Sequence, residues 1–405
     1  MNTKCITDNL LCSGCGTCNA ICNLRAITMK KSSVMGLLYA DIETDKCTDC
    51  GLCLNVCPSR NILDEKESLS EKKVIGNIIE CHVGRSLDKE IFNNAQSGGM
   101  VTTVLSCLFE KGKIDAAISC RMEQGNPTPS VHFSILTTSK ELKSNQKSCY
   151  TQVDIVSALR EISRFKSVAI VGVPCHIQGV SNLMRFKKFG NITYRIGLIC
   201  DKTYSDTYME AIIHGVKRPQ GEIKIFYRLK NFEFKGRYHS YQQAPAVIAN
   251  REGDIAIIPK SKRVFLKDYF TVPKCQICWD KLNTQADIVF GDPWGLKGHY
   301  DEKEGDSVVI VRTAVGKSII DDLLNSNLIA TIEIDMPSVA EGQLIAKRVK
   351  SIRGANWSDI QKQWNTLETS DKQSLLKRIN RKYRLWILKN KIFMVLSKII
   401  SVPLK

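Results

Sequence analysis

The sequence has no apolar run long enough to cross a membrane. A spanning helix needs about 18 or more consecutive apolar residues, and no stretch of the chain reaches that length. The N-terminus also lacks the basic start and apolar segment of a secretory signal peptide. We therefore expect a cytoplasmic protein, in which cysteines stay reduced and clustered cysteines usually bind metals.

No zinc-finger or RNA-recognition motif accompanies the basic balance of the chain. The net charge is +17, yet residues 1–65 are almost neutral, whereas residues 372–405 contain ten Lys or Arg and no acidic residue. A basic surplus suits either nucleic acid or an anionic membrane surface. Because the nucleic-acid motifs are missing, we predict no nucleic-acid partner.

Cysteine, by contrast, is abundant, with 17 residues. Two runs share the pattern C-x2-C-x2-C-x3-C, the first with Cys12, Cys15, Cys18 and Cys22 and the second with Cys47, Cys50, Cys53 and Cys57. This is the spacing of bacterial-type ferredoxins with two [4Fe–4S] clusters, in which the fourth cysteine of each run ligates the other cluster. We therefore predict that Cys57 completes the first cluster and Cys22 the second.

Zinc is the alternative for sites with four cysteines. Zinc sites favour two separated C-x2-C pairs, so triple cysteines repeated at this spacing favour iron. Asn23 stands where the second run has Pro58, but neither residue is a ligand. Cys5 lies outside both runs, and we expect it to be an ordinary thiol.

The chain is long enough, at 405 residues, for two or three domains. Residues 37–42 are expected to form a strand of the ferredoxin module, and the polar stretch 64–73 has the composition of a linker. We expect an α+β protein with a ferredoxin-type domain at 1–65, a mixed α/β core at 75–345 and a basic helical tail at 346–405.

Residues 97–112 have the apolar spacing of a helix, with Ser97 as the expected N-cap and Gly112 as its end. Gly98 and Gly99 are costly in a first turn unless another group approaches the backbone closely. A phosphate at the helix N-terminus is one such group, and a tight packing turn is the other explanation.

Four later cysteines follow or adjoin predicted strands. Cys175 follows the apolar run 167–172, Cys200 ends the strand 194–200, and Cys275 and Cys278 form a C-x2-C pair. Spacing alone leaves several interpretations open: a third cluster, a redox dithiol, half of a zinc site, or small buried residues. Further strands are expected at 286–291 and 307–313.

Five stretches in this order resemble the beta-subunit family of coenzyme F-420-reducing hydrogenases and F-420-linked dehydrogenases: residues 96–102, 172–179, 197–200, 275–278 and 286–295. The resemblance implies a flavin-binding core with FAD and its own [4Fe–4S] cluster. It also implies that the core cluster is held by Cys175, Cys200, Cys275 and Cys278, and that FAD lies against Ser97, Gly98, Gly99, Val101 and Thr102.

The chain departs from this family at Ser148-Cys149-Tyr150, where relatives commonly have Ser-Lys-Tyr. The missing lysine weakens a phosphate or flavin contact unless Lys147 replaces it. His176 is a candidate proton donor or a packed histidine, and Asp292 is a candidate flavin or substrate contact or a turn residue. No catalytic acid or base is assigned.

These observations lead to the hypothesis of an iron–sulfur flavoprotein oxidoreductase. Single electrons would pass between a partner, such as ferredoxin or a redox subunit, and FAD through three [4Fe–4S] clusters, and then reach a small-molecule substrate such as an F-420-type coenzyme. The alternative is an electron-transfer subunit without its own substrate. The tail has an apolar face from Leu385 to Ile399, which fits either peripheral membrane contact or packing on protein.

Overall fold

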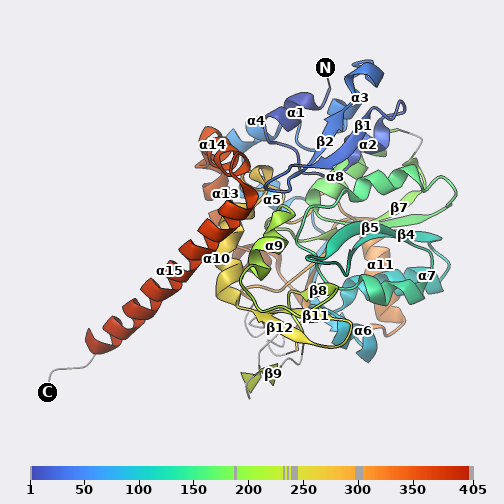
Figure 1. Cartoon of the computed structure of the whole chain (residues 1–405). Helices are drawn as coiled ribbons and strands as arrows, with labels where there is room; N and C mark the ends of the chain where they lie inside the picture. Colours follow the sequence, from blue (N-terminus) through green and yellow to red (C-terminus); the bar gives the residue numbers. More distant parts are fainter. Residues whose placement is uncertain are drawn as a thin grey trace.

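The computed structural model describes residues 2–400, apart from 187–188, 231–232, 235–236, 239–244 and 297–303. Within these residues the chain forms an N-terminal module, a mixed α/β body and a helical C-terminal region (Figure 1). This arrangement confirms the expected fold class at the level of α/β content and order of parts.

The N-terminal module is built on one hairpin. Strands β1 (Ile27–Lys31) and β2 (Leu38–Ile42) pair antiparallel, with Ile27 opposite Ile42, and β2 lies where a strand was predicted. Short helices carry or flank the cysteines: α1 (Lys4–Asp8), α2 (Thr17–Ile21), η1 (Thr44–Lys46), α3 (Leu52–Asn55) and α4 (Ile62–Glu67).

The body is organised around an eight-stranded sheet in the order β15-β3-β14-β13-β7-β6-β4-β5. The central strands β4, β6, β7 and β13 run parallel, whereas the outer neighbours pair antiparallel. The strands span Glu80–Ser86 (β3), Ala116–Glu123 (β4), Ser130–Leu136 (β5), Val168–Gly172 (β6), Ile192–Leu198 (β7), Ile288–Gly291 (β13), Ser307–Val311 (β14) and Ile329–Ile334 (β15). The strands predicted near 167–172, 194–200, 286–291 and 307–313 are therefore confirmed.

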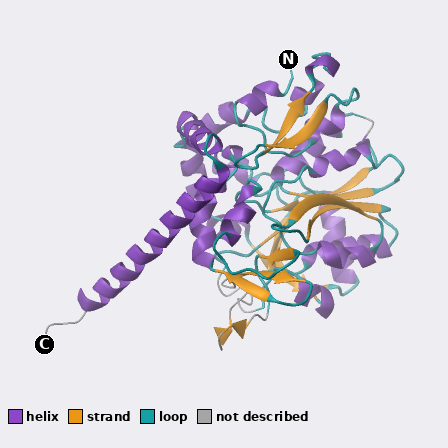
Figure 2. Ribbon diagram, viewed as in Figure 1, coloured by secondary structure: helices purple, strands orange, loops and turns teal. Residues whose placement is uncertain are grey.

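Helices cover both faces of this sheet (Figure 2). On one face, α7 (Met100–Glu110) and α11 (Ala314–Asn325) bury Val104 and Ile320 against Ala169 and Val171 of β6. On the other, α8 (Pro174–Leu183) and η3 (Ile155–Arg160) pack with Val168 and Ile170. Strand β6 is buried on both faces because its side chains alternate between these two layers.

The remaining elements surround the body. A three-stranded sheet has the order β12-β11-β8, with β8 (Ile223–Phe226), β11 (Ala246–Asn250) and β12 (Ile255–Ile258), and β9 (Glu233–Phe234) pairs with β10 (Arg237–Tyr238). The other helices are η2 (Ser139–Asn145), α6 (Lys89–Asn94), α9 (Thr207–Ile213), α10 (Lys260–Phe270) and η5 (Pro273–Gln276).

The predicted linker at 64–73 is wrong as a description of the local structure. Helix α4 extends into it, and α5 (Glu71–Ile75) begins with Ser70 as N-cap. Leu69 and Val74 are fully buried. The polar residues of this stretch therefore lie on the outer faces of two packed helices, because Ile62 fixes α4, Val74 fixes α5, and Leu69 is buried in the segment between them.

The N-cap predicted at Ser97 is also wrong. Helix α7 starts at Met100, and Gly99 is its N-cap with a φ of 80°, a left-handed conformation that favours glycine. The end of the helix agrees with the prediction, since Gly112 follows it with a φ of 62°.

The C-terminal region consists of α12 (Met336–Gly342), α13 (Ile345–Arg353), α14 (Trp357–Glu368) and α15 (Lys372–Ile400). Leu375, Leu376 and Ile379 at the start of α15 are buried, and Trp386 packs on Phe265 of α10 with ring centroids 5.7 Å apart. Beyond this, α15 extends away from the body (Figure 1). The predicted apolar face continues into 391–400, whose side chains lie outside the described residues. Among the helices described, none is both long and apolar enough to span a membrane.

Candidate functional site

The first predicted ligand set, Cys12, Cys15, Cys18 and Cys57, comes together in the N-terminal module. Burial raises the pKa of Cys12 to about 11 and raises the pKa of Cys18 well above its usual value. The charges of neighbouring thiols add to both shifts, that of Cys15 for Cys12 and those of Cys12, Cys15 and Cys57 for Cys18. A cavity opens between these four thiols and is walled also by Ile6, Met29 and Pro58. Four thiols that disfavour each other's charge fit a positively charged inorganic group between them.

Backbone and side-chain donors already point at this set. The Gly14 N–H donates to Cys12 Sγ at 3.4 Å, and Thr17 Oγ1 lies 3.1 Å from Cys15 Sγ. Hydrogen bonds to cluster sulfurs stabilise the reduced state and raise the reduction potential.

The second predicted set, Cys22, Cys47, Cys50 and Cys53, lies nearer the surface. Cys53 is buried, Cys22 and Cys47 are half-buried, and Cys50 is exposed. The Asn2 side chain donates to Cys47 Sγ at 3.6 Å. That these four thiols hold one cluster stays a prediction from their spacing.

The third set, Cys175, Cys200, Cys275 and Cys278, is assembled from three separate parts of the body. Cys175 lies in the first turn of α8, Cys200 just beyond β7, and the C-x2-C pair at η5. Burial, and then the charges of the other three thiols, raise the pKa of Cys200. The structure therefore brings together four residues that are up to 103 positions apart in the sequence, as counted from Cys175 to Cys278.

Lys274 lies between the first and third thiol sets. It is 3% exposed, and its Nζ donates to Cys278 Sγ at 3.4 Å. Its positive charge lowers the pKa of Cys12 and Cys57 in the first set and of Cys175 in the third, against the larger effect of burial. Sequence reasoning missed this residue, although a lysine beside the cysteine of a C-x2-C pair was a visible signal.

Within the described residues, no three His, Cys, Asp or Glu side chains are arranged to hold a single metal ion. A tetrahedral zinc with Zn–S bonds of about 2.3 Å needs its four sulfurs roughly 3.8 Å apart. A cubane of four irons keeps its thiolates farther apart. The choice of iron–sulfur clusters over zinc for these sets stays a prediction from the cysteine spacing.

The turn predicted to contact FAD, residues 97–99 directly before α7, is called the Ser97 turn. It packs tightly against the sheet. A Cβ on Gly98 would lie 2.5 Å from the Gly84 carbonyl oxygen, and the Gly98 N–H donates to Ser307 Oγ at 3.0 Å. Close packing is therefore sufficient to explain why position 98 is a glycine. Ser97 Oγ also contacts Ser307 Oγ, at 3.2 Å, while Val101 and Thr102 are half-buried at the start of α7.

A group of cations lies beside this turn. Lys147 Nζ donates to Asn94 Oδ1 at 3.0 Å and stands over the Phe226 ring, and Lys224 stands over the same ring. Burial, and then the charge of Lys224, lower the pKa of Lys147. Neither lysine forms an ion pair with a carboxylate in the part of the chain that the structure describes. Two such ammonium groups close together favour an anionic ligand.

Asp292 belongs to the same region. Its carboxylate accepts a 2.8 Å hydrogen bond from Arg228, which also reaches the Tyr150 hydroxyl at 3.5 Å. The Gln96 side chain donates to that hydroxyl at 2.7 Å. Asp292 is thus connected through Arg228 and the Tyr150 hydroxyl to Gln96, the residue directly before Ser97. Arg228 was missed because its partner is 64 residues away in the sequence.

His176 is packed rather than open. It is 6% exposed, and burial, with a smaller effect of Lys274, lowers its pKa to about 4. Its Nδ1 accepts a 3.4 Å hydrogen bond from the Val173 N–H. The neutral, buried ring fits the interpretation of a packing residue.

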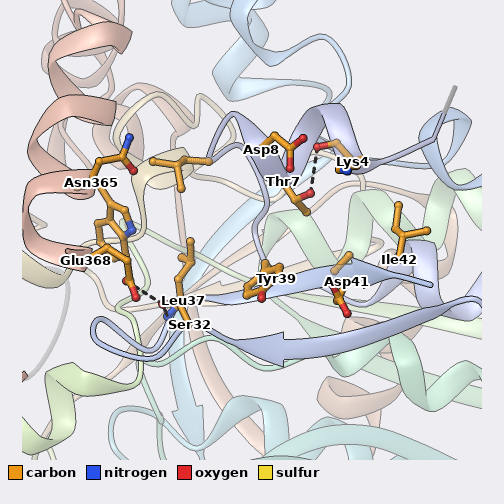
Figure 3. A pocket seen from close by; sticks show the side chains of 13 residues that line it. Lys4, Thr7, Asp8, Ser32, Leu37, Tyr39, Asp41, Ile42, Asn365 and Glu368 are labelled. Carbon is orange, nitrogen blue, oxygen red and sulfur yellow. Dashed lines mark hydrogen bonds between the residues drawn. The ribbon is translucent and has the colours of Figure 1, made fainter. Parts of the chain in front are cut away.

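A second hollow lies between the N-terminal module and α14 (Figure 3). Trp364 and Glu368 line one side and Lys4 and Tyr39 the other. The Glu368 carboxylate accepts a hydrogen bond from Ser32 Oγ at 2.9 Å. The hollow lies where α14 joins the module.

Comparison with known families matches three stretches of the chain between residues 11 and 337. The family described as coenzyme F420 hydrogenase/dehydrogenase, beta subunit, matches residues 81–160 with its N-terminal part and residues 165–337 with its C-terminal part. Residues 11–61 match a 4Fe-4S dicluster domain. The chain belongs to the F420 hydrogenase/dehydrogenase beta-subunit family.

Individual relatives agree with the family assignment. One subunit of the F(420)H(2) dehydrogenase of Methanosarcina mazei is 26% identical over 77% of this chain and 82% of its own length. The coenzyme F420 hydrogenase subunit beta of Methanococcus voltae is 28% identical over 64% of this chain and 86% of its own length.

A solved structure shares the fold of this beta-subunit family member. A chain of the F420-reducing [NiFe] hydrogenase complex from Methanosarcina barkeri superposes with a TM-score of 0.54 and 23% identity, covering 73% of this chain and 94% of that one. The resemblance stated from five short motifs is confirmed. The individual site residues stay predictions.

Proposed function

We propose that this protein is an iron–sulfur flavoprotein oxidoreductase that couples single-electron transfer to a two-electron organic substrate. The observation that supports this most directly is the position of the first and third thiol sets on either side of the buried Lys274. Iron–sulfur clusters pass single electrons and a flavin exchanges one or two, which is the chemistry these groups would supply when bound.

The thiol sets suggest an order for the three proposed [4Fe–4S] clusters. The set with Cys50 includes an exposed thiol, whereas the first set includes the buried Cys15 and Cys18. The core set adjoins the first set, since the charge of Cys15 raises the pKa of Cys175. A surface set suits exchange with a partner protein such as ferredoxin or a redox subunit. The relatives named above are themselves subunits of hydrogenases or dehydrogenases.

The residues that would hold FAD are those around the Ser97 turn. Lys147 and Lys224 supply positive charge for its pyrophosphate, and Lys147 stands two positions before the lysine of the family pattern. Ser97, Gly98, Gly99, Val101 and Thr102 provide the adjacent backbone. An F-420-type coenzyme is the substrate class that the names of the relatives suggest, among other small molecules.

The second candidate is an electron-transfer subunit that feeds a partner oxidoreductase. The named relatives favour it, because each is one subunit of a larger enzyme. The two candidates differ in one measurement: the enzyme reduces or oxidises an F-420-type coenzyme by itself, whereas the subunit does so only with its partner present.

The cofactor content tests the proposal. Protein purified without oxygen is expected to contain about 12 iron atoms, as three [4Fe–4S] clusters require, and one FAD per chain. Replacing Cys200 by Ser is expected to remove about one third of the iron, whereas Cys107→Ser, a buried cysteine outside all three sets, leaves the content unchanged. Four zinc atoms and no flavin would end the proposal.

Localisation and membrane contact belong to the same proposal. We place the protein in the cytoplasm, with α15 as its site of peripheral membrane contact, because the exposed part of this helix carries Leu385 and Leu388 among basic residues. The division into domains at 1–65, 75–345 and 346–405 also stays a prediction.

A further inference from the structure

Two cysteines outside the three thiol sets face each other close to the Ser97 turn. Cys120 is on β4, and Cys149 is in the loop that follows η2. Their Sγ atoms are 3.9 Å apart and in hydrogen-bonding contact. Cys149 is 6% exposed and Cys120 is half-buried, so Cys120 is the more exposed residue of the pair.

We propose that Cys120 and Cys149 form a redox-active dithiol that low-molecular-weight disulfides convert into an intramolecular disulfide. A disulfide bond is about 2.05 Å long, so the sulfurs need to approach each other by less than about 2 Å. Nothing else lies between them, since they are already in contact. In a reducing compartment, disulfides of this kind are usually transient and redox-sensing.

The loop that carries Cys149 is the part expected to move. Lys147 and Tyr150, on either side of it, have φ values of 86° and 62°. Such left-handed conformations are disfavoured for residues with a Cβ. Cys120 is fixed instead by its strand, where it pairs with Phe133 of β5.

The two thiols have different roles in the reaction. The hydrogen bond between them lowers the pKa of Cys120 and raises that of Cys149, and burial raises the latter further. Since the thiolate is the nucleophile, Cys120 attacks the disulfide RSSR, forms Cys120–S–S–R and releases RS⁻.

Cys149 completes the reaction. Its thiol gives up a proton and attacks the Cys120 sulfur, which breaks the mixed disulfide and releases the second RS⁻. The two thiol protons of the protein end on the two leaving groups. In total, two protein thiols and RSSR become one protein disulfide and two RSH, so the protein pair loses two electrons and the oxidant gains them.

The state of this pair is coupled to the Ser97 turn. The Ser148 N–H donates to Gln96 Oε1 at 3.2 Å, and Gln96 Nε2 donates to the Tyr150 hydroxyl at 2.7 Å. A shift of the Cys149 loop therefore acts on the residue directly before Ser97. This consequence for FAD rests on the proposed function, whereas the disulfide itself does not.

Peptide mapping of the full chain tests the inference. The anaerobically purified protein is incubated with glutathione disulfide, blocked with iodoacetamide and digested with trypsin without reduction. Trypsin releases residues 114–121 and 148–160, each with a single cysteine. The expected product is these two peptides joined by a disulfide that dithiothreitol reverses. Cys107, which is buried on α7, serves as the internal standard and is expected to react at least about ten-fold more slowly than Cys120.

Single variants separate the two roles. Cys149→Ser should leave glutathione bound to Cys120, whereas Cys120→Ser should slow modification at position 149 by about ten-fold. Failure to join the two wild-type peptides, or equally fast reaction of Cys149 in Cys120→Ser, would overturn the inference. Because the wild-type mapping needs neither variant nor flavin, it gives its answer even where a variant folds poorly or FAD is absent.

Discussion

At the residue scale, Lys274 has the most specific expected effect. Its buried ammonium group lies among thiols of the first and third sets, where its charge favours an added electron on either proposed cluster. Lys274→Met should lower the reduction potential of at least one cluster by on the order of 100 mV, from a unit charge at close range in a protein interior. An EPR-monitored redox titration measures this shift.

Two further variants of this kind make the measurement specific. Lys274→Arg keeps the charge and should restore most of the potential, whereas Lys72→Met, an exposed lysine on α5, should leave it unchanged. Equal potentials in Lys274→Met and the native protein, with the iron content intact, would contradict the role of this charge.

At the scale of elements, the contact between α2 and α8 attaches the N-terminal module to the body. Gly179 of α8 faces Thr17 of α2, and a Cβ at position 179 would lie 2.0 Å from Thr17 Oγ1. Thr17 is 1% exposed and touches Cys15 Sγ, so the contact is also adjacent to the first thiol set. Arg160 of η3 adds a second connection by donating to the carbonyl oxygens of Asn19 and Cys22.

Gly179→Ala is therefore expected to lower the free energy of unfolding, although alanine has a higher helix propensity than glycine. Alanine in a helix interior normally stabilises by about 1 kcal/mol relative to glycine, but overpacking at this contact should destabilise by about 1–3 kcal/mol. Thermal unfolding measures the change. Gly354→Ala, where the nearest atom to a Cβ is 3.4 Å away, should be close to neutral.

A double variant identifies the cause. Thr17→Ala removes Oγ1 and Cγ2, the nearest and the third-nearest atoms that a Cβ at position 179 would meet, and leaves only the Cβ of residue 17 at 3.2 Å. Gly179→Ala in the Thr17→Ala background should therefore cost much less than in the native protein. If the cost is the same in both backgrounds, the contact between α2 and α8 is not its source.

At the scale of the whole molecule, the C-terminal helix divides into a packed and a projecting part. Residues up to Trp386 contact α10, whereas Leu388 is 55% exposed. Removing residues 389–405 should leave the melting temperature and the iron content unchanged, because the described packing contacts of α15 come before them. Binding to vesicles with anionic lipids should fall, because three basic residues within the apolar segment or next to it are lost: Lys389, Lys391 and Lys398.

Co-sedimentation with vesicles of neutral and of anionic lipids, at low and at high salt, checks this expectation. Equal binding of the native and shortened chains would show that the tail is not a membrane contact. A loss of thermal stability on shortening would favour the other prediction, that the whole helix packs on protein.

The sequence by itself determined the chemistry of the cysteines and most of the regular structure. Ligand spacing in the two N-terminal runs is local, because a short loop must wrap several thiolates around one cluster, and it identified the 4Fe-4S domain. The strands β6, β7, β13 and β14 were predicted because buried β-branched runs are also local signals. The end of α7 at Gly112 was likewise predicted from a local signal.

Only the tertiary structure decided which distant residues meet. The position of Lys274 between two thiol sets and the contact of Cys120 with Cys149 both depend on how strands and loops are ordered in the sheet. For Cys175, Cys200, Cys275 and Cys278, spacing alone left the convergence open, and only the resemblance to the family implied it. The start of α7 and the packed helices at 64–73 were mispredicted for the same reason. A serine or a polar stretch has several local conformations of similar energy, and packing against Ser307 or around Leu69 selects among them.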